Sequence, residues 1–291
     1  MTGRPTEGYY GRPIIKPPVW KDEIAWYLFT GGLAGGSSAL GLAARVTGNR
    51  ALARSATFTA AAALTASPVL LVKDLGRPER FVNMLRVVKP SSPMNVGSWI
   101  LTAAGTAAGA AAACEATDVL PRVRALSQGV AGLLGPALAT YTAVLISDTA
   151  VPVWHEARNE LPLVFASGAA ASAGAAAVIL TPTDAAGPAR RMMLAGAVGE
   201  IAATTVMERR LGDLGEPYHR GEAGALARAA KAATAVGAAL GAVAGRRRFA
   251  GRLAAGLVLG GAVAERFAVF RAGFQSAEDP RYVVMSQRSP R

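Results

Sequence analysis

Two carboxylic acids and two tyrosines lie in or beside long apolar runs, where their side chains could move protons or hold a polar ligand. Glu200 has eight mostly apolar residues before it and seven after it. An ionised carboxylate in such surroundings needs a partner, a proton or water. Asp74 stands beside Lys73 at the end of another run, so it is either a functional carboxylate or half of an ordinary interfacial pair. Proton movement at a membrane is therefore the first chemistry that these residues suggest.

The two tyrosines inside apolar runs suggest a ligand with a hydrogen-bond acceptor. Tyr27 occurs in "WYLFTGG" and Tyr141 in "ATYTAVLIS". A buried phenol needs a partner for its hydroxyl group, and a quinone carbonyl is a suitable acceptor. The alternative is an aromatic residue at the membrane interface. That alternative is stronger for Tyr27, near the start of its run, than for Tyr141, which lies deeper.

Several common kinds of redox and catalytic site are missing from the sequence. The two histidines, His155 and His219, lie between apolar runs, whereas a haem in a membrane subunit needs axial histidines within the spans. Cys114 is the single cysteine, and no nucleotide-binding Gly-rich motif or cluster of metal ligands occurs. We therefore expect neither haem nor metal in this chain.

The composition is typical of an integral membrane protein. Hydrophobic residues make up 52% of the 291 residues and charged residues 17%. Eight apolar runs are long enough to cross about 30 Å of hydrocarbon. They cover residues 24–44, 55–72, 96–114, 128–147, 161–182, 192–207, 225–245 and 249–270. We predict an all-α integral membrane protein, a bundle of eight transmembrane helices that could divide into two four-helix halves. A soluble Ala-rich bundle is the alternative, but it should show polar stripes at helical spacing, which most of these runs lack.

The alternation of eight spans also predicts how the chain is organised. An N-terminal extramembrane segment, 1–23, precedes the transmembrane domain, 24–270, and a C-terminal tail, 271–291, follows it. Both termini and the longer connections then share one side, which we call side A, and the short basic connections share side B. Lys and Arg in short connections favour the cytoplasm, so we expect side B inside and side A on the outer face. The net charge of +12 lies in these connections and predicts no nucleic-acid partner.

Small residues at four-residue spacing could bring helices together. The pairs are Gly32 with Gly36 and Gly105 with Gly109. Such spacing lets helix backbones approach closely in lipid. In a chain so rich in Ala and Gly the spacing also arises by chance, so both interpretations stay open.

Three motifs, together with the order and number of apolar runs, resemble a known family. They are "YYGRPIIKPPVWKDEIAWYLFTGGLAGG" at residues 9–36, "DLGRPERFVNMLRVVKPSSPMNVGSW" at 74–99 and "YTAVLISDTAVPVW" within 140–154. The family is that of the NrfD and polysulfide reductase membrane subunits. The resemblance implies a haem-free, quinone-reactive anchor in the cytoplasmic membrane, with menaquinone as the expected quinone. It also implies two partners: a four-cluster iron–sulfur subunit and a molybdenum- or tungsten-containing molybdopterin subunit.

The resemblance also assigns roles to residues. It implies that Tyr27 and Tyr141 contact the quinone, although polysulfide reductase has a His where this chain has Tyr27. Asp74 matches the acidic residue that the family associates with proton movement. Reduction of a quinone takes two electrons and two protons, so we expect Asp74 and Glu200 to carry protons.

Other features of such a complex stay open at this stage. Arg77, Arg80 and Arg86 could dock an acidic patch of the iron–sulfur subunit, or they could cap helix ends and contact lipid phosphates. Enzymes of anaerobic respiration that act on formate, polysulfide, thiosulfate or nitrite all use anchors of this kind. A formate dehydrogenase is therefore one candidate complex among several, because another chain sets the substrate.

Other functions also compete with the redox subunit. Glu200, Asp148 and Glu265 lie in or near spans, which suggests a secondary transporter or proton channel. Transporters usually show interruptions at corresponding places in two repeats, and the prolines of this chain form no such matched pair. An inert anchor whose quinone site has decayed is a further alternative. The retention of Tyr27, Asp74 and Tyr141 argues against it.

Overall fold

The apolar runs form long helices joined by short connections. The computed structural model describes residues 13–244 and 247–288. The beginning of the first family-like motif, residues 9–12, lies outside these residues. Within them the chain forms eleven α-helices, one 3-10 helix and no strand. The fold is therefore all-α, as the sequence predicts.

Eight of the helices have 20 or more residues; two short α-helices and the 3-10 helix lie in their connections, and a third short α-helix follows the last of them. The long helices are α1 (Asp22–Val46), α2 (Arg50–Leu75), α4 (Pro93–Thr117), α5 (Pro121–Ser147), α7 (Leu161–Leu180), α8 (Gly187–Leu211), α9 (Gly221–Val243) and α10 (Arg248–Glu278). The short elements are α3 (Pro78–Met84), α6 (Pro152–Glu156), η1 (Gly212–Tyr218) and α11 (Pro280–Arg288).

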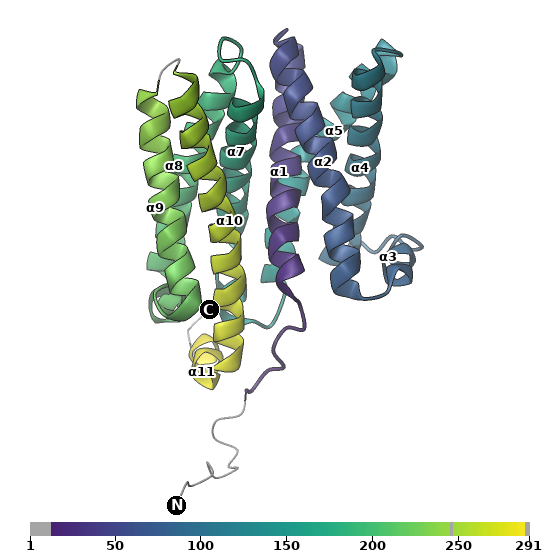
Figure 1. The fold of residues 1–291 in the computed structure, drawn as a ribbon. Helices are drawn as coiled ribbons and strands as arrows, with labels where there is room; N and C mark the ends of the chain where they lie inside the picture. The colour runs from purple at the N-terminus through teal and green to yellow at the C-terminus, as the bar shows by residue number, and fades with distance from the viewer. Residues whose placement is uncertain (1–12, 245–246, 289–291) are drawn as a thin grey trace, which may run out of the picture.

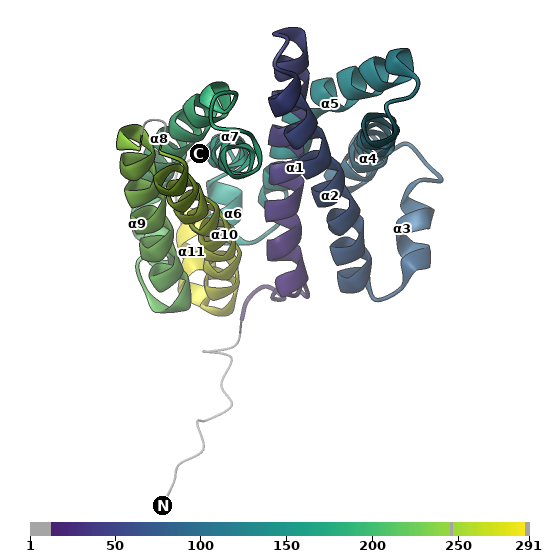
Figure 2. The ribbon, with the colours of Figure 1, turned by 45° about the horizontal axis from the view of Figure 1, so that its top comes forward.

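The long helices form two groups of four. Helices α1, α2, α4 and α5 make one group, and α7, α8, α9 and α10 make the other, with α1 packed against α7 between them (Figure 1). The second view shows the same separation, with α1 between helices α2, α4 and α5 on one side and helices α7 and α10 on the other (Figure 2). Elements α3 and α11 lie at one end of the bundle, where α1 begins (Figure 1). That end is side A of the sequence analysis.

Six of the long helices are long and apolar enough to cross a membrane: α2, α4, α5, α7, α9 and α10. The chain is therefore a multi-pass membrane protein. Two helices predicted as spans, α1 and α8, fall outside this set. The first is rich in Gly, Ser and aromatic residues, and the second carries Glu200 together with arginines at both ends. The predicted count of eight spans is thus supported for six helices.

Glycines allow α1 to pack closely against α5 and α7. A Cβ atom built on Gly35 would lie 2.4 Å from the carbonyl oxygen of Gly135 in α5, and one built on Gly36 would lie 2.4 Å from the carbonyl oxygen of Ala169 in α7. Neither position has room for a side chain.

The predicted pair of Gly32 with Gly36 faces α7. A Cβ atom built on Gly32 would lie 3.5 Å from the Cβ atom of Ala169, the residue that Gly36 also meets. By contrast, no neighbouring atom lies within 4 Å of a Cβ built on Gly105 or Gly109. The four-residue spacing therefore marks helix packing in α1 and not in α4.

Candidate functional site

A cavity of about 680 Å³ lies at the side A end of α4 and α5. The start of α4 and the last two turns of α5 form its apolar walls, with Val96, Ile100 and Val144 among the lining residues. One polar residue precedes α4, and the others come from the end of α5 and from the segment that follows. They are Ser91, Thr140, Tyr141, Ser147, Asp148, His155, Arg158 and Asn159. A mostly apolar cavity of this size with a few polar groups is typical of a small-molecule site.

Tyr141 lines this cavity, and its hydroxyl group lacks a hydrogen-bond partner among the described residues. The residue is 9% exposed, and its hydroxyl oxygen is buried with no hydrogen-bond partner among the described residues. It lies six residues before the end of α5, or about 9 Å along the helix axis. A buried phenol usually finds a partner. A ligand with an acceptor oxygen would satisfy this one.

Gly97 of α4 leaves room for the Tyr141 ring. A Cβ atom built on Gly97 would lie 2.2 Å from Cε2 of Tyr141, so any larger residue must displace the ring. We expect Gly97→Ala to lower the free energy of unfolding by about 1–3 kcal/mol, the usual effect of overpacking. Thermal unfolding of the purified protein in detergent measures this change. Gly105→Ala in the same helix is the matched control, because open space surrounds that position; an equal loss there would contradict the packing argument.

His155 is a second polar residue of the cavity, and the sequence did not single it out as a site residue. Its Nδ1 atom lies 3.3 Å from the carbonyl oxygen of Ser147. A carbonyl oxygen can only accept, so Nδ1 donates this hydrogen bond and Nε2 stays able to accept a proton. The neighbouring Trp154 fixes the α6 turn, because its Nε1 atom donates to the carbonyl oxygen of Val269 at 2.7 Å. Helix α6 thus returns His155 to the end of α5.

Tyr27 lies directly behind the cavity without lining it. It is 2% exposed, and its ring meets the Tyr141 ring edge to face, with 6.5 Å between the ring centroids. Asp74 is farther from the cavity walls, at the end of α2. Its Oδ1 atom accepts a hydrogen bond of 2.9 Å from the backbone N–H of Lys21. The adjacent Lys73 lies 2.9 Å from Glu23 in an ion pair, so this part of α2 holds the start of α1.

The three arginines predicted to dock a partner are all exposed on side A. Arg80 donates a hydrogen bond of 3.1 Å to the carbonyl oxygen of Leu75 at the end of α2, which is a helix-capping contact. Arg77 precedes α3, and Arg86 follows it. No ion pair holds either of these two side chains within the described residues. Their docking role stays a prediction.

Glu200 lies in the other group of helices, away from the cavity walls. It is 3% exposed, and its Oε1 atom is 3.9 Å from Nη1 of Arg266, which is 2% exposed. Arg266 also donates a hydrogen bond of 3.1 Å to the carbonyl oxygen of Phe165. Its guanidinium carbon lies 3.9 Å from the centroid of the Phe165 ring. Glu265 is buried beside this pair and accepts a hydrogen bond of 3.5 Å from Thr204.

The predicted site residues therefore fall into three places. Tyr141 lines the cavity, with Tyr27 behind it. Asp74 lies at the contact between α2 and the start of α1, and Glu200 lies in a separate buried cluster of charges. No group of three or more His, Cys, Asp or Glu side chains in the described part of the chain could hold a metal ion.

One family model matches the chain, that of polysulphide reductase, NrfD, over residues 14–209. The matched region runs from just before α1 almost to the end of α8, so it includes the cavity and all the predicted site residues. A comparison with curated proteins finds no match.

Proposed function

Since this chain belongs to the polysulphide reductase NrfD family, we propose that it exchanges electrons between an iron–sulfur subunit and the membrane quinone pool. Members of this family are membrane subunits of polysulfide reductase-type oxidoreductases, and they assemble with iron–sulfur and molybdopterin subunits. The observation that carries the quinone role is the cavity at the end of α5, because its lining includes Tyr141, whose buried hydroxyl has no hydrogen-bond partner among the described residues.

The cavity suits a quinone ring. Its apolar walls would cover the two faces of the ring, and the Tyr141 hydroxyl would donate a hydrogen bond to a carbonyl oxygen. When bound, the quinone supplies two-electron, two-proton chemistry. Nδ1 of His155 carries a hydrogen and donates it to the carbonyl oxygen of Ser147. The other ring nitrogen, Nε2, would therefore accept a proton from the bound molecule. Asp148 lies in the same lining and offers a carboxylate between the cavity and side A.

The remaining predictions about the site complete this proposal. Tyr27, which the resemblance predicts to contact the quinone, lies outside the cavity lining, and we propose that it holds the Tyr141 ring in place through their edge-to-face contact. Asp74 would carry protons at the membrane edge and Glu200 within the membrane. Menaquinone is the proposed quinone. The partners would be a four-cluster iron–sulfur subunit and a molybdopterin subunit, which Arg77, Arg80 and Arg86 would help to dock.

We also propose that α1 and α8 cross the membrane, giving eight spans. Each has 25 residues, which is about 37 Å of helix. Both lie alongside the six apolar helices (Figure 1). Neighbouring helices cover much of their surfaces, so they need fewer apolar side chains than helices in contact with lipid. The bundle would lie in the cytoplasmic membrane with side A on the outer face.

Filling the cavity tests the quinone role. Val144 lines the cavity and is 43% exposed, so Val144→Trp should occupy the space of the ring without disturbing the buried core. We expect quinone-linked turnover of the assembled complex to fall at least about 10-fold, a loss of 1.4 kcal/mol or more in transition-state stabilisation. Turnover with a water-soluble dye that takes electrons from the partner subunits should be retained.

Leu133→Trp is the matched control. Leu133 is 76% exposed on the same helix and lies outside the cavity lining. This variant should keep wild-type quinone-linked turnover. Equal turnover of the two variants would contradict the proposed site.

The buried charges in the second group of helices favour one other function, a proton channel. Glu200, Glu265 and Arg266 are each 2–3% exposed, and ionisable groups at such depth often belong to proton pathways. A chain that conducts protons without quinone would keep proton flux in Val144→Trp.

A further inference from the structure

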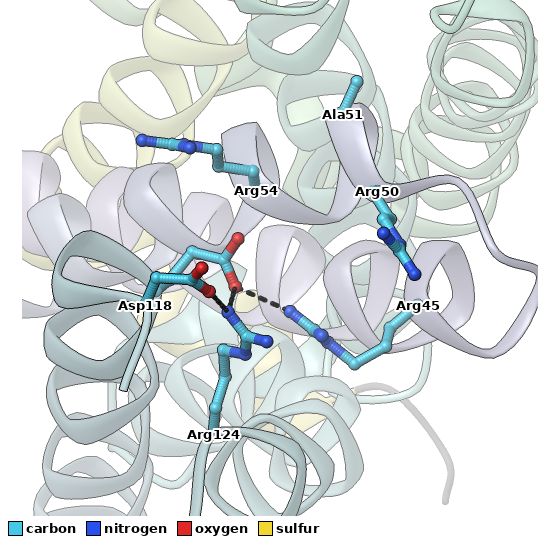
Figure 3. Close-up of a pocket in the computed structure, with 7 residues that line it drawn as sticks. Arg45, Arg50, Ala51, Arg54, Asp118 and Arg124 are labelled. Carbon is cyan, nitrogen blue, oxygen red and sulfur yellow. Dashed lines mark hydrogen bonds and ion pairs between the residues drawn. The ribbon is translucent and has the colours of Figure 1, made fainter. Parts of the chain in front are cut away.

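The side B ends of four helices surround a second cavity, of about 460 Å³, that the proposed redox function does not use. Arginines from α1, α2 and α5 gather there around two carboxylates (Figure 3). The charged residues of this arginine pocket are Arg45, Arg50, Arg54, Arg124, Glu115 and Asp118. With four arginines against two carboxylates, two positive charges remain.

Two of the arginines are held by the carboxylates. Arg45 lies 2.7 Å from Glu115, and Arg124 lies 3.5 Å from the same oxygen of Glu115 and 3.0 Å from Asp118. Arg45 also donates to the side chain of Gln128. These contacts fix one wall of the pocket, formed by α1, α4 and α5.

The carboxylates do not hold the other two arginines, and the guanidinium carbon of Arg54 lies 5.7 Å from the centroid of the Phe58 ring. Arg50 and Arg54 are exposed on the first turns of α2, and neither forms an ion pair among the described residues. Arg50 is also the first residue of α2, so the positive end of the helix dipole adds to the charge. An anion in the pocket would supply acceptors for both guanidinium groups.

Apolar side chains border the pocket where α4 connects to α5. Val119 is 51% exposed and Leu120 is 60% exposed. The backbone here is strained, because Asp118 and Leu120 both have φ of 52° although neither is glycine. The Asp118–Arg124 ion pair holds this turn. A cationic pocket beside exposed apolar side chains matches a ligand with a phosphate group and an apolar part.

We propose that the arginine pocket binds a phosphate group, with Arg50 and Arg54 as its principal partners. The phosphate belongs either to the headgroup of an anionic phospholipid or to a soluble phosphate. Both share the same chemistry, since Arg forms paired N–H···O bonds with phosphate oxygens.

The test uses the full chain, purified with its partner subunits, in nanodiscs of phosphatidylcholine alone or mixed with phosphatidylglycerol. Thermal unfolding is the measurement, since a ligand that binds only the folded state raises the Tm. We expect phosphatidylglycerol to raise the Tm of the wild type by about 2–4 °C. Inorganic phosphate, added to phosphatidylcholine nanodiscs, is the second arm. A rise with the lipid alone identifies a headgroup site, and a rise with inorganic phosphate identifies a site for soluble phosphate.

Two double variants separate the pocket from the general charge of side B. The variant Arg50→Gln with Arg54→Gln should lose the rise in Tm, because both side chains are exposed and their loss leaves the fold intact. The control, Arg122→Gln with Arg191→Gln, removes two exposed arginines outside the pocket lining and should keep the rise. Native mass spectrometry of the same samples should show retained phosphatidylglycerol in the wild type and the control only. The proposal is wrong if neither ligand stabilises the wild type, or if the two variants behave alike.

Discussion

Tyr141→Phe should lower quinone-linked turnover of the assembled complex by about 10²-fold, the lower end of the usual effect of removing one hydrogen-bond donor from an oxygen that gains negative charge during the reaction. The substitution removes only the hydroxyl, which is buried and has no partner among the described residues. The phenyl ring keeps its edge-to-face contact with Tyr27 and its place against Gly97. Turnover with a water-soluble dye should stay at the wild-type rate, since electrons then bypass the cavity.

Tyr27→Phe is the matched control for this experiment. Tyr27 is a tyrosine of the same helix group that lies behind the cavity rather than in its lining. We expect its loss of the hydroxyl to change quinone-linked turnover less than the loss at Tyr141. Equal reductions would show that Tyr27 takes part as directly as Tyr141. Wild-type turnover in Tyr141→Phe would remove the main support for the proposed quinone site.

The sequence could single out Tyr141 as a candidate ligand contact, but it could not show that His155 would line the same cavity. The Tyr141 prediction needed only the chemistry of a phenol inside an apolar run, which is local information. The position of His155 depends on α6, whose turn is fixed by a hydrogen bond from Trp154 to Val269, 115 residues away. A single sequence does not reveal such a contact. The sequence offered one indication: His155, one of the two histidines, lies close after the apolar run that forms α5.

The same limit applies to the buried charges. The sequence indicated that Glu200 needs a partner, and Arg266 was visible as a charge in a later run. Their pairing depends on α7 as well, because a Cβ atom built on Gly168 would lie 2.1 Å from Oε1 of Glu200 and 2.6 Å from Nη2 of Arg266. Only the assembled bundle shows that a glycine makes room for both side chains. The helices themselves were predictable because length and hydropathy are local properties.

Arg266→Met should destabilise the bundle by about 3–5 kcal/mol, the usual cost of removing one partner from a buried ion pair. The Arg266 guanidinium faces Glu200 and interacts electrostatically with Glu265. Its removal would leave these two carboxylates, each 3% exposed, without its positive charge beside them. A methionine also cannot replace the hydrogen bond to the carbonyl oxygen of Phe165. Thermal unfolding in detergent measures the loss. Arg252→Met in the same helix is the control, since Arg252 is exposed.

A double substitution then shows whether the loss comes from the unpaired carboxylate. Glu200→Gln removes the charge that Arg266 leaves behind, so Glu200→Gln with Arg266→Met should be more stable than Arg266→Met alone, and the two effects should not add. Additive losses would mean that the residues do not interact energetically. Glu200→Gln by itself removes a titratable group and leaves Glu265 as the remaining carboxylate that interacts with Arg266. If this substitution lowers proton release during quinone-linked turnover while the electron-transfer rate to a dye is unchanged, Glu200 carries protons. If proton release is unchanged, the Glu200–Arg266 pair holds α8 to α10 and has no part in proton movement.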